Sequence, residues 1–325
     1  GCDWIVANDV SPEGGVMGRA AQLEALAALS HEMFTDEKTA KLLEAAEAEL
    51  QGQPYDSDAA SVVRVVKQDY ADETKLPTEY VAEYARVTTE AHEVWAKARA
   101  NKDYAAFAPM MERLVDLAHR AAGYLGYSEH PYDALLGRYE RGMTASQVKA
   151  IFDAHKPQLV ELIAAIGKVE NRVSDALVKL DYDTDKQREF GLWVTKAIGF
   201  DFSRGRQDVS VHPFCTSFAK GDVRITTRFD RNYLNPALFG MMHEAGHGMY
   251  EQGVGDALDG TPLGGGTSLA VHESQSRLWE NIVGRSKGFW SWALPKLKET
   301  FPAQVNGVSV DAFYKAINKV ERQFI

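Results

Sequence analysis

The sequence predicts a mainly α-helical fold with a small antiparallel β-sheet directly before a later helix. Two observations support this prediction. Apolar residues recur at helical spacing from about Met17 to Lys168, whereas polar and apolar residues alternate in parts of the segment from Phe200 to Phe229. No repeat, low-complexity tract or linker divides the 325 residues, so we expect a single domain over residues 1–325.

Amphipathic helices are expected in succession through the first half of the chain. Leu23, Leu26 and Leu29, for example, lie at helical spacing. A further helix is expected from about Asp185 to Ile198, and another begins with Asn235 as N-cap and Pro236 at its first position. Breaks between helices are expected at residues 52–54, 76–77, 126–131 and 142.

Two short segments, Asp208–His212 and Asp222–Thr227, alternate as strands do. In the second, Asp222, Arg224 and Thr226 share one face, and the two residues between them share the other. The polar face either borders a substrate-binding cleft or is an exposed face with an Asp–Arg pair. Both readings stay open at this level.

His243, Glu244 and His247 form an H-E-x-x-H pattern in a segment predicted to be helical. Positions i and i+4 lie on one helix face, so the two histidines can bind one metal ion beside Glu244 as general base. Gly246 and Gly248 weaken a helix by about 1 kcal/mol each relative to Ala. We expect them where another segment or a substrate approaches closely. The alternative is two surface histidines on an ordinary helix.

A catalytic zinc site needs a third protein ligand, and Glu273 is the best candidate. It follows His243 by 30 residues, in a helix expected to begin at Thr267 or Ser268. His272 is a rival ligand, but it points about a quarter turn away from Glu273. We expect His272 to line the cleft or to support a ligand. Two histidines and a glutamate suit Zn²⁺ and tolerate Co²⁺ or Mn²⁺.

Composition limits the partners and the compartment. The formal net charge of −10 and the lack of a basic run argue against nucleic acid. No apolar stretch approaches the length of a membrane span. Cys2 and Cys215 do not make a disulfide framework, and Cys215 is expected to be a buried thiol. A reduced, cytoplasmic setting is therefore the expectation.

Four motifs follow one another in a fixed order: His212-Pro213-Phe214, Asp222-Val223-Arg224-Ile225-Thr226, the H-E-A-G-H pattern, and His272-Glu273-Ser274-Gln275. In this order and spacing they resemble the M32 metallocarboxypeptidases of the carboxypeptidase Taq type. The stretch from His130 to Thr144 is also similar, and the likeness extends from about Pro12 to the last residue.

The resemblance implies a large helical zinc-peptidase fold with the substrate in a deep cleft. It also implies a homodimeric carboxypeptidase of broad specificity, in which a metal-activated water hydrolyses the C-terminal peptide bond of peptides. His212, Asp222, Arg224, His272 and Gln275 are then expected to contact the substrate. The pattern itself leaves a helical oligopeptide metalloendopeptidase open, and also an inactive metal-binding fragment.

The family carries two further motifs, I-R-x-x-A-D and G-x-x-Q-D-x-H-W, which are not found before Ile325. We therefore expect this chain to be a fragment that lacks both termini. The missing part is expected to hold the terminal carboxylate of the substrate and to polarise the scissile carbonyl.

Overall fold

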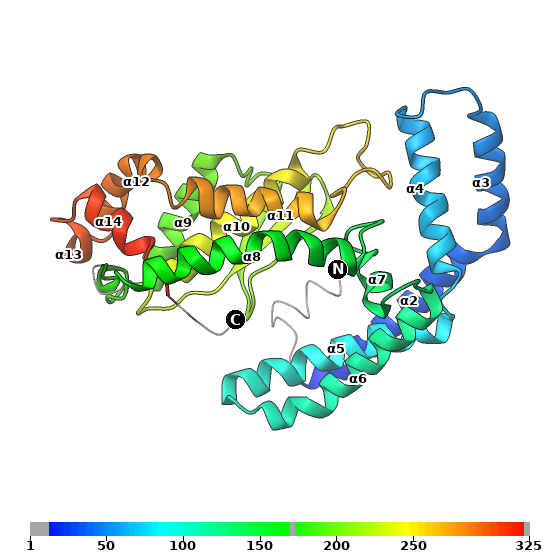
Figure 1. Cartoon of the computed structure of the whole chain (residues 1–325), viewed down its shortest axis with the longest axis horizontal. Coiled ribbons are helices and arrows are strands. Elements are labelled where there is room, and N and C mark those ends of the chain that lie inside the picture. The colour runs from blue at the N-terminus through cyan, green and yellow to red at the C-terminus, as the bar shows by residue number, and fades with distance from the viewer. Residues whose placement is uncertain (1–12, 170–172, 322–325) are drawn as a thin grey trace. The chain divides into compact units, whose positions relative to one another are not determined.

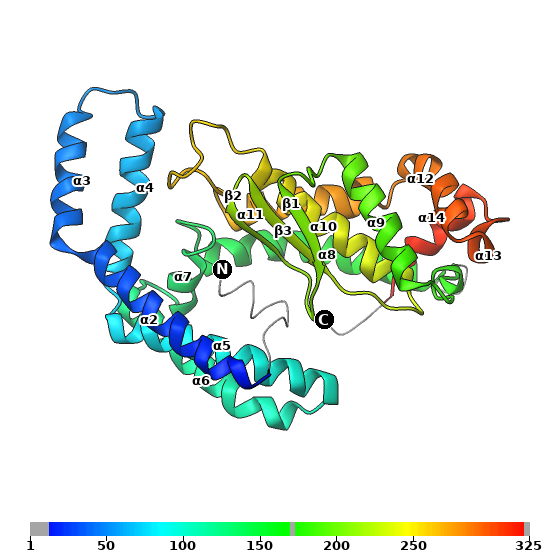
Figure 2. The same ribbon diagram turned by 180° about the vertical axis from the view of Figure 1, so that it is seen from behind.

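The computed structural model describes residues 13–169 and 173–321. The chain forms two compact units, one of Gly1–Ala145 with Gly255–Gly265, the other of Ser146–Val254 with Gly266–Ile325. Figures 1 and 2 show the chain from opposite sides. The single domain expected from the sequence stays a prediction.

The first unit is helical throughout its regular elements. These are η1 (Glu13–Gly15), α2 (Val16–Thr35), α3 (Glu37–Glu49), α4 (Asp58–Glu73), α5 (Thr78–Asn101), α6 (Tyr104–Leu125) and α7 (Pro131–Leu136). Helix α5 packs against both α2 and α6. The predicted breaks all fall between helices, although Pro131 already begins α7. At three of the breaks Gly52, Gly126 and Gly142 have positive φ angles, which favour glycine.

The second unit contains the sheet and the remaining helices. Its elements are α8 (Ala145–Gly167, of which Ala145 belongs to the first unit), η3 (Ala176–Val178), α9 (Thr184–Ile198), β1 (Gly205–Val209), β2 (Cys215–Ala219), β3 (Asp222–Thr227), α10 (Leu234–Gln252), α11 (Leu269–Arg277), the π-helical η4 (Leu278–Val283), α12 (Lys287–Thr300), α13 (Pro302–Val305) and α14 (Val310–Ile317). The mainly helical fold with one small sheet is confirmed.

The sheet has the order β1-β3-β2. Strand β2 pairs antiparallel with β3, but β1 pairs parallel with β3, so the sheet is mixed and not antiparallel throughout. The first strand was also predicted too late in the chain, at Asp208–His212. The observed β1 runs from Gly205 to Val209 and pairs Gly205 with Val223. A Cβ at Gly205 would lie 2.5 Å from the carbonyl oxygen of Val223, so this pairing requires glycine.

Helix α10 is the central helix of the second unit. It packs against the sheet, α9 and α11 (Figure 2), and also against η4. Val223 and Ile225 of β3 are fully buried, and together with Phe200 they pack against Ala245 of α10. The shared apolar face predicted for this strand is therefore confirmed.

The start of α10 differs from the prediction by two residues. The N-cap is Tyr233, with no side-chain hydrogen bond, and Leu234 is the first helical residue. Asn235 therefore lies inside the helix, and its buried Oδ1 atom has no hydrogen-bond partner among the described residues.

The main core of the second unit joins α9, α10, α12 and α14. Its largest member is Trp290, which is fully buried, donates a 2.8 Å hydrogen bond to the carbonyl oxygen of Gly284 and contacts Phe313. Cys215 is a free thiol, but the residue is of intermediate exposure and not fully buried as expected; the burial it has raises the pKa of its sulfur. Cys2 lies outside the described residues. Among the described helices, none combines the length and apolar character that crossing a membrane would need.

Candidate metal and catalytic site

Helix α10 holds two histidines one turn apart on one face. The residues around them are buried against the rest of the unit, among them Met242, Ala245 and Gly246. His243 and His247 keep side-chain exposures of 18% and 13%, so they sit at the edge of the packed interior. Their ring centroids lie 4.9 Å apart. One helix therefore presents two imidazoles to the same small region.

Gly246 lets a second helix come close to this face. A Cβ at this position would lie 2.7 Å from both the carbonyl oxygen of Gln275 and the Cα of Ser276, which are backbone atoms of α11. A Cβ at Gly248 would similarly lie 2.6 Å from the ring of Phe200. The close approach predicted for both glycines is confirmed. Helix α11 begins where expected, because the Ser268 side chain accepts a hydrogen bond from the backbone N–H of Val271.

The third predicted ligand lies between the two histidines. The Oε2 atom of Glu273 is 3.5 Å from Nε2 of His243 and 3.3 Å from Nε2 of His247. One ligand atom from each residue lies within 4.8 Å of the others. Zn–N and Zn–O bonds of about 2.0–2.2 Å in a tetrahedron place two ligand atoms about 3.3–3.5 Å apart. The donor set and its spacing therefore fit a divalent metal ion.

Each histidine uses its other ring nitrogen for a protein contact. Nδ1 of His243 lies 2.9 Å from Oε2 of Glu280, and Nδ1 of His247 lies 2.6 Å from Nδ1 of His272. Metal-binding histidines almost always have such a partner, which fixes the tautomer and the ring orientation. The two Nε2 atoms thereby face Glu273.

Glu280 was not predicted from the sequence. It follows Glu273 by seven residues, so it returns to nearly the same helix face, and this spacing is the signal that would have indicated it. It lies in the π-helical segment η4, a type of turn that occurs frequently at functional sites. Arg277 and Arg285 form ion pairs with it at 3.2 and 3.7 Å, so this carboxylate is held from several sides.

The electrostatics of the site favour neutral imidazole at one histidine and a cation nearby. Burial, with the nearby His272 and His243, lowers the pKa of His247 to about 4. At His243 burial acts in the same direction, but the hydrogen bond that its Nδ1–H group donates to Glu280 and the charges of Glu244 and Glu273 outweigh it and raise the pKa. A positive charge is therefore stabilised at this point.

Glu244 is itself buried, and burial raises the pKa of its carboxyl to about 7. The pKa of Glu273 is lowered: burial acts to raise it, but the charge of His243 and hydrogen bonds from Ser276 and Arg277 outweigh burial. The two carboxylates thus have different environments, one apolar and one polar. Such a pair suits one group that exchanges a proton and another that stays ionised.

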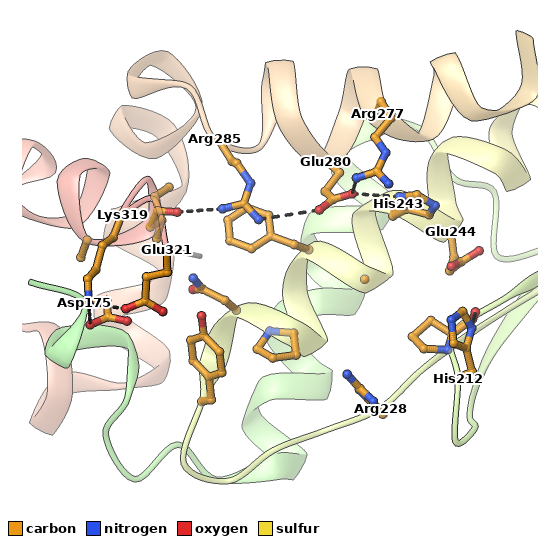
Figure 3. Close-up of a pocket in the computed structure, with 18 residues that line it drawn as sticks. Asp175, His212, Arg228, His243, Glu244, Arg277, Glu280, Arg285, Lys319 and Glu321 are labelled. Atoms are coloured by element: carbon orange, nitrogen blue, oxygen red, sulfur yellow. Dashed lines mark hydrogen bonds and ion pairs between the residues drawn. The ribbon is translucent and has the colours of Figure 1, made fainter. Parts of the chain in front are cut away.

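A cavity of about 510 Å³ opens beside these residues within the second unit (Figure 3). His243 and Glu244 form part of its wall, and His212 and Arg228 lie across from them. Both of these come from the polypeptide around the sheet: His212 follows β1, and Arg228 directly follows β3. Sequence reasoning predicted His212 but missed Arg228, which is the first residue after the D-x-R-x-T strand.

Four residues predicted to contact the substrate do not line this cavity. Arg224 and Asp222 form a two-bond ion pair at 2.8 Å, with the guanidinium over the ring of Phe218. Their role in substrate binding, like that of Gln275, stays a prediction. Both ring nitrogens of His272 contact protein groups, one of them on His247, so the geometry agrees with the expectation that His272 supports a ligand. Its contact with the substrate stays a prediction.

Comparison with known proteins matches a single family along almost the whole chain. Residues 7–325 match the family described as Carboxypeptidase Taq (M32) metallopeptidase. Thermostable carboxypeptidase 1 of Thermus thermophilus is 39% identical over 324 residues, which cover 97% of this chain and 63% of that protein. Carboxypeptidase 1 of Bacillus subtilis is 34% identical over 316 residues, covering 97% of this chain and 62% of that protein.

The crystal structure of BsuCP is also similar, with a TM-score of 0.95 and 33% identity over 100% of this chain and 65% of that one. The chain thus spans less than two thirds of the length of these relatives. A family of metallopeptidases implies a divalent metal, in agreement with the cluster of His243, His247 and Glu273. The chain belongs to the M32 family of metallopeptidases, the carboxypeptidase Taq family.

Proposed function

We propose that the whole protein is a metallocarboxypeptidase of broad specificity, which removes the C-terminal residue of peptides by hydrolysis. The observation that carries the proposal is the convergence of two histidine Nε2 atoms on one Glu273 oxygen, at 3.3 and 3.5 Å, next to a cavity that Glu244 lines. The names of the relatives, which are carboxypeptidases, support the exopeptidase reaction.

His243, His247 and Glu273 would hold the metal, which we propose to be Zn²⁺, with Co²⁺ or Mn²⁺ as substitutes. When bound, a divalent ion lowers the pKa of a water molecule from 15.7 to about 7 and polarises a carbonyl group. Glu244 borders the cavity and accepts a proton from the attacking water as its oxygen bonds to the scissile carbon. Glu244 then donates that proton to the departing nitrogen as the C–N bond breaks, so the carboxylate is restored.

A carboxypeptidase also has to recognise a free terminal carboxylate. Four cationic side chains line the cavity. Arg277 and Arg285 both pair with Glu280, and Lys319 pairs with Asp175.

Arg228 is exposed, and within residues 13–169 and 173–321 it has no hydrogen bond or ion pair. Its side chain reaches toward the cavity (Figure 3). We therefore assign the carboxylate contact, as far as this chain supplies one, to Arg228.

The test compares a peptide with a free C-terminus and the same peptide amidated, using the full-length enzyme loaded with zinc. Stepwise loss of single C-terminal residues from the free peptide, with little cleavage of the amide, is expected. Internal cuts in both peptides would instead indicate an endopeptidase, and no cleavage at all would indicate a metal-binding protein without this activity.

Arg228→Ala should raise the KM for the free peptide at least tenfold. It should leave the affinity for zinc unchanged, because Arg228 contacts none of the three proposed ligands through a hydrogen bond or ion pair. An unchanged KM would show that Arg228 does not bind the terminal carboxylate of the substrate.

Two further proposals rest on the family resemblance and on composition. The full-length protein is a homodimer, which sedimentation equilibrium would measure directly. Its compartment is the cytoplasm, which cell fractionation of the source organism would test. The acidic net charge of −10 supports the absence of nucleic acid as a partner.

A further inference from the structure

His247 is linked through two hydrogen bonds to a carboxylate on its own helix. Its Nδ1 atom lies 2.6 Å from Nδ1 of His272, and Nε2 of His272 lies 2.6 Å from Oε1 of Glu251. Glu251 follows His247 by four residues, so it lies one turn further along the same face of α10. His272 reaches this face from α11, where it directly precedes Glu273.

The chemistry of the three groups selects one arrangement of protons. An ionised carboxylate only accepts hydrogen bonds, so Nε2 of His272 donates to Glu251. A cation bound at Nε2 of His247 leaves the ring proton on Nδ1, so His247 donates this hydrogen bond and Nδ1 of His272 accepts it. The lone pair on Nε2 of His247 is left facing Oε2 of Glu273 at 3.3 Å. Two acceptors at this distance are stabilised by a cation between them.

The surroundings hold His272 in this position. A Cβ at Gly266 would lie 2.3 Å from Cδ2 of His272, so glycine is needed for the imidazole to occupy its site. The ring of Tyr250 contacts the imidazole ring of His272 edge-on, with centroids 4.9 Å apart. The side chains of Glu251 and His272 are 12% and 20% exposed, so little water competes for their hydrogen bond.

We propose that His272 and Glu251 form a positioning pair, which fixes His247 in its Nδ1–H tautomer and so strengthens binding of a divalent cation. The inference rests on the proposed function only in requiring that His243, His247 and Glu273 bind such an ion. Neither His272 nor Glu251 contacts the ion in this arrangement; both act through His247. Loss of such a partner costs about 10- to 100-fold in metal affinity.

The experiment measures the dissociation constant of Zn²⁺ by competition with a chromogenic chelator, in the intact protein and in variants. Glu251→Leu and His272→Leu should each weaken binding about 10- to 100-fold. The double variant should bind zinc no more weakly than the single variant of lower affinity, because the two residues act in series on one ligand. Glu251→Gln keeps an acceptor oxygen at similar length but loses the charge, so its affinity should lie between those of the wild type and Glu251→Leu.

A matched control is available in the first unit. His31 is buried in α2 and hydrogen-bonded through both ring nitrogens, to Thr78 and to the carbonyl oxygen of Glu73. His31→Leu therefore removes a hydrogen-bonded imidazole far along the sequence from the ligands, and it should leave the zinc dissociation constant unchanged. Far-ultraviolet circular dichroism of each metal-free variant checks its fold, and the nearly isosteric Glu251→Gln serves if a leucine variant does not fold.

Two outcomes would overturn the inference. Wild-type zinc affinity in Glu251→Leu or Glu251→Gln, or a double variant whose loss equals the product of the two single losses, would show that the pair does not act through His247. A wild-type protein without zinc affinity would overturn the proposed function as well. The failure of the inference alone is therefore distinguishable from the failure of both.

Discussion

Replacing Gly246 by alanine should weaken the metal site although it improves the helix. The added methyl group would lie 2.7 Å from the carbonyl oxygen of Gln275 and from the Cα of Ser276, whereas ordinary van der Waals contact begins at 3.4 Å. These are backbone atoms, so no side chain can turn aside. Helix α11 would have to move away from α10 by about 0.7 Å, and Glu273 would move with it.

The magnitudes decide the sign of the effect. Alanine in place of glycine inside a helix gains about 1 kcal/mol, and overpacking a tight contact costs about 1–3 kcal/mol. The free energy of unfolding should therefore fall by up to about 2 kcal/mol. Metal–ligand distances tolerate about ±0.2 Å, so a displacement of about 0.7 Å should reduce zinc affinity at least tenfold, or about 1.4 kcal/mol.

Urea unfolding of the metal-free protein and zinc competition with a chelator measure the two effects separately. Gly288→Ala is the control, because Gly288 also lies in a helix of the second unit and the nearest atom to its added Cβ is 3.9 Å away. It should keep wild-type zinc affinity without losing stability. If Gly246→Ala keeps both wild-type stability and wild-type zinc affinity, the tight contact between α10 and α11 does not position Glu273.

Three further changes test other parts of the molecule. Glu244→Gln should retain zinc but lose turnover of the full-length enzyme, which atomic absorption and a peptide assay would separate; retained turnover would exclude Glu244 as the base. At Asp175 burial acts to raise the pKa, but hydrogen bonds from Lys179 and Lys319 lower it below the ordinary value. The charged Asp175 thus stabilises the fold above about pH 4, and this effect is lost as the pH falls through its lowered pKa. In urea titrations Asp175→Asn should lower the free energy of unfolding by about 1 kcal/mol at pH 7 and by less at pH 3. A difference between wild type and variant that grows in acid would contradict this. Trp290→Ala should reduce the free energy of unfolding by about 3–5 kcal/mol, because the side chain is fully buried, and a loss below 1 kcal/mol would contradict its place in the core.

The sequence was most informative where a local pattern carries the chemistry. The spacing of His243 and His247 predicts one helix face, and the structure places both imidazoles there. The glycine at 246 predicted a close neighbour, and α11 is that neighbour. Glu273 was predicted from a cap and a loop length, both of which reflect short-range geometry.

The errors concern contacts between segments that are distant in the sequence. Alternation of polar and apolar residues locates a strand but carries no information on the direction of its partner, so the parallel pairing of β1 with β3 was missed. Glu280 and Glu251 follow ligands by seven and four residues, spacings that many solvated helix carboxylates share. Their hydrogen bonds to His243 and His272 depend on how α10 packs against α11 and η4, which no single segment specifies.

The start of α10, with Tyr233 as N-cap, was also mispredicted because a local pattern carries no information on tertiary packing. The Asn-Pro pair at 235–236 is a strong local signal for a helix N-terminus. The helix nevertheless begins two positions earlier, and its first residue, Leu234, is buried in the main core. Tertiary packing here outweighs a cap that would contribute about 1 kcal/mol.

The zinc retained per protein chain after dialysis of Glu273→Ala tests the central claim most directly, namely that His243, His247 and Glu273 bind one divalent ion. Glu299→Ala is the control, since Glu299 is an exposed glutamate on α12 of the same unit. The wild type and Glu299→Ala should each retain about one zinc per chain. Glu273→Ala should lose it; full zinc occupancy in that variant would contradict the three-ligand site.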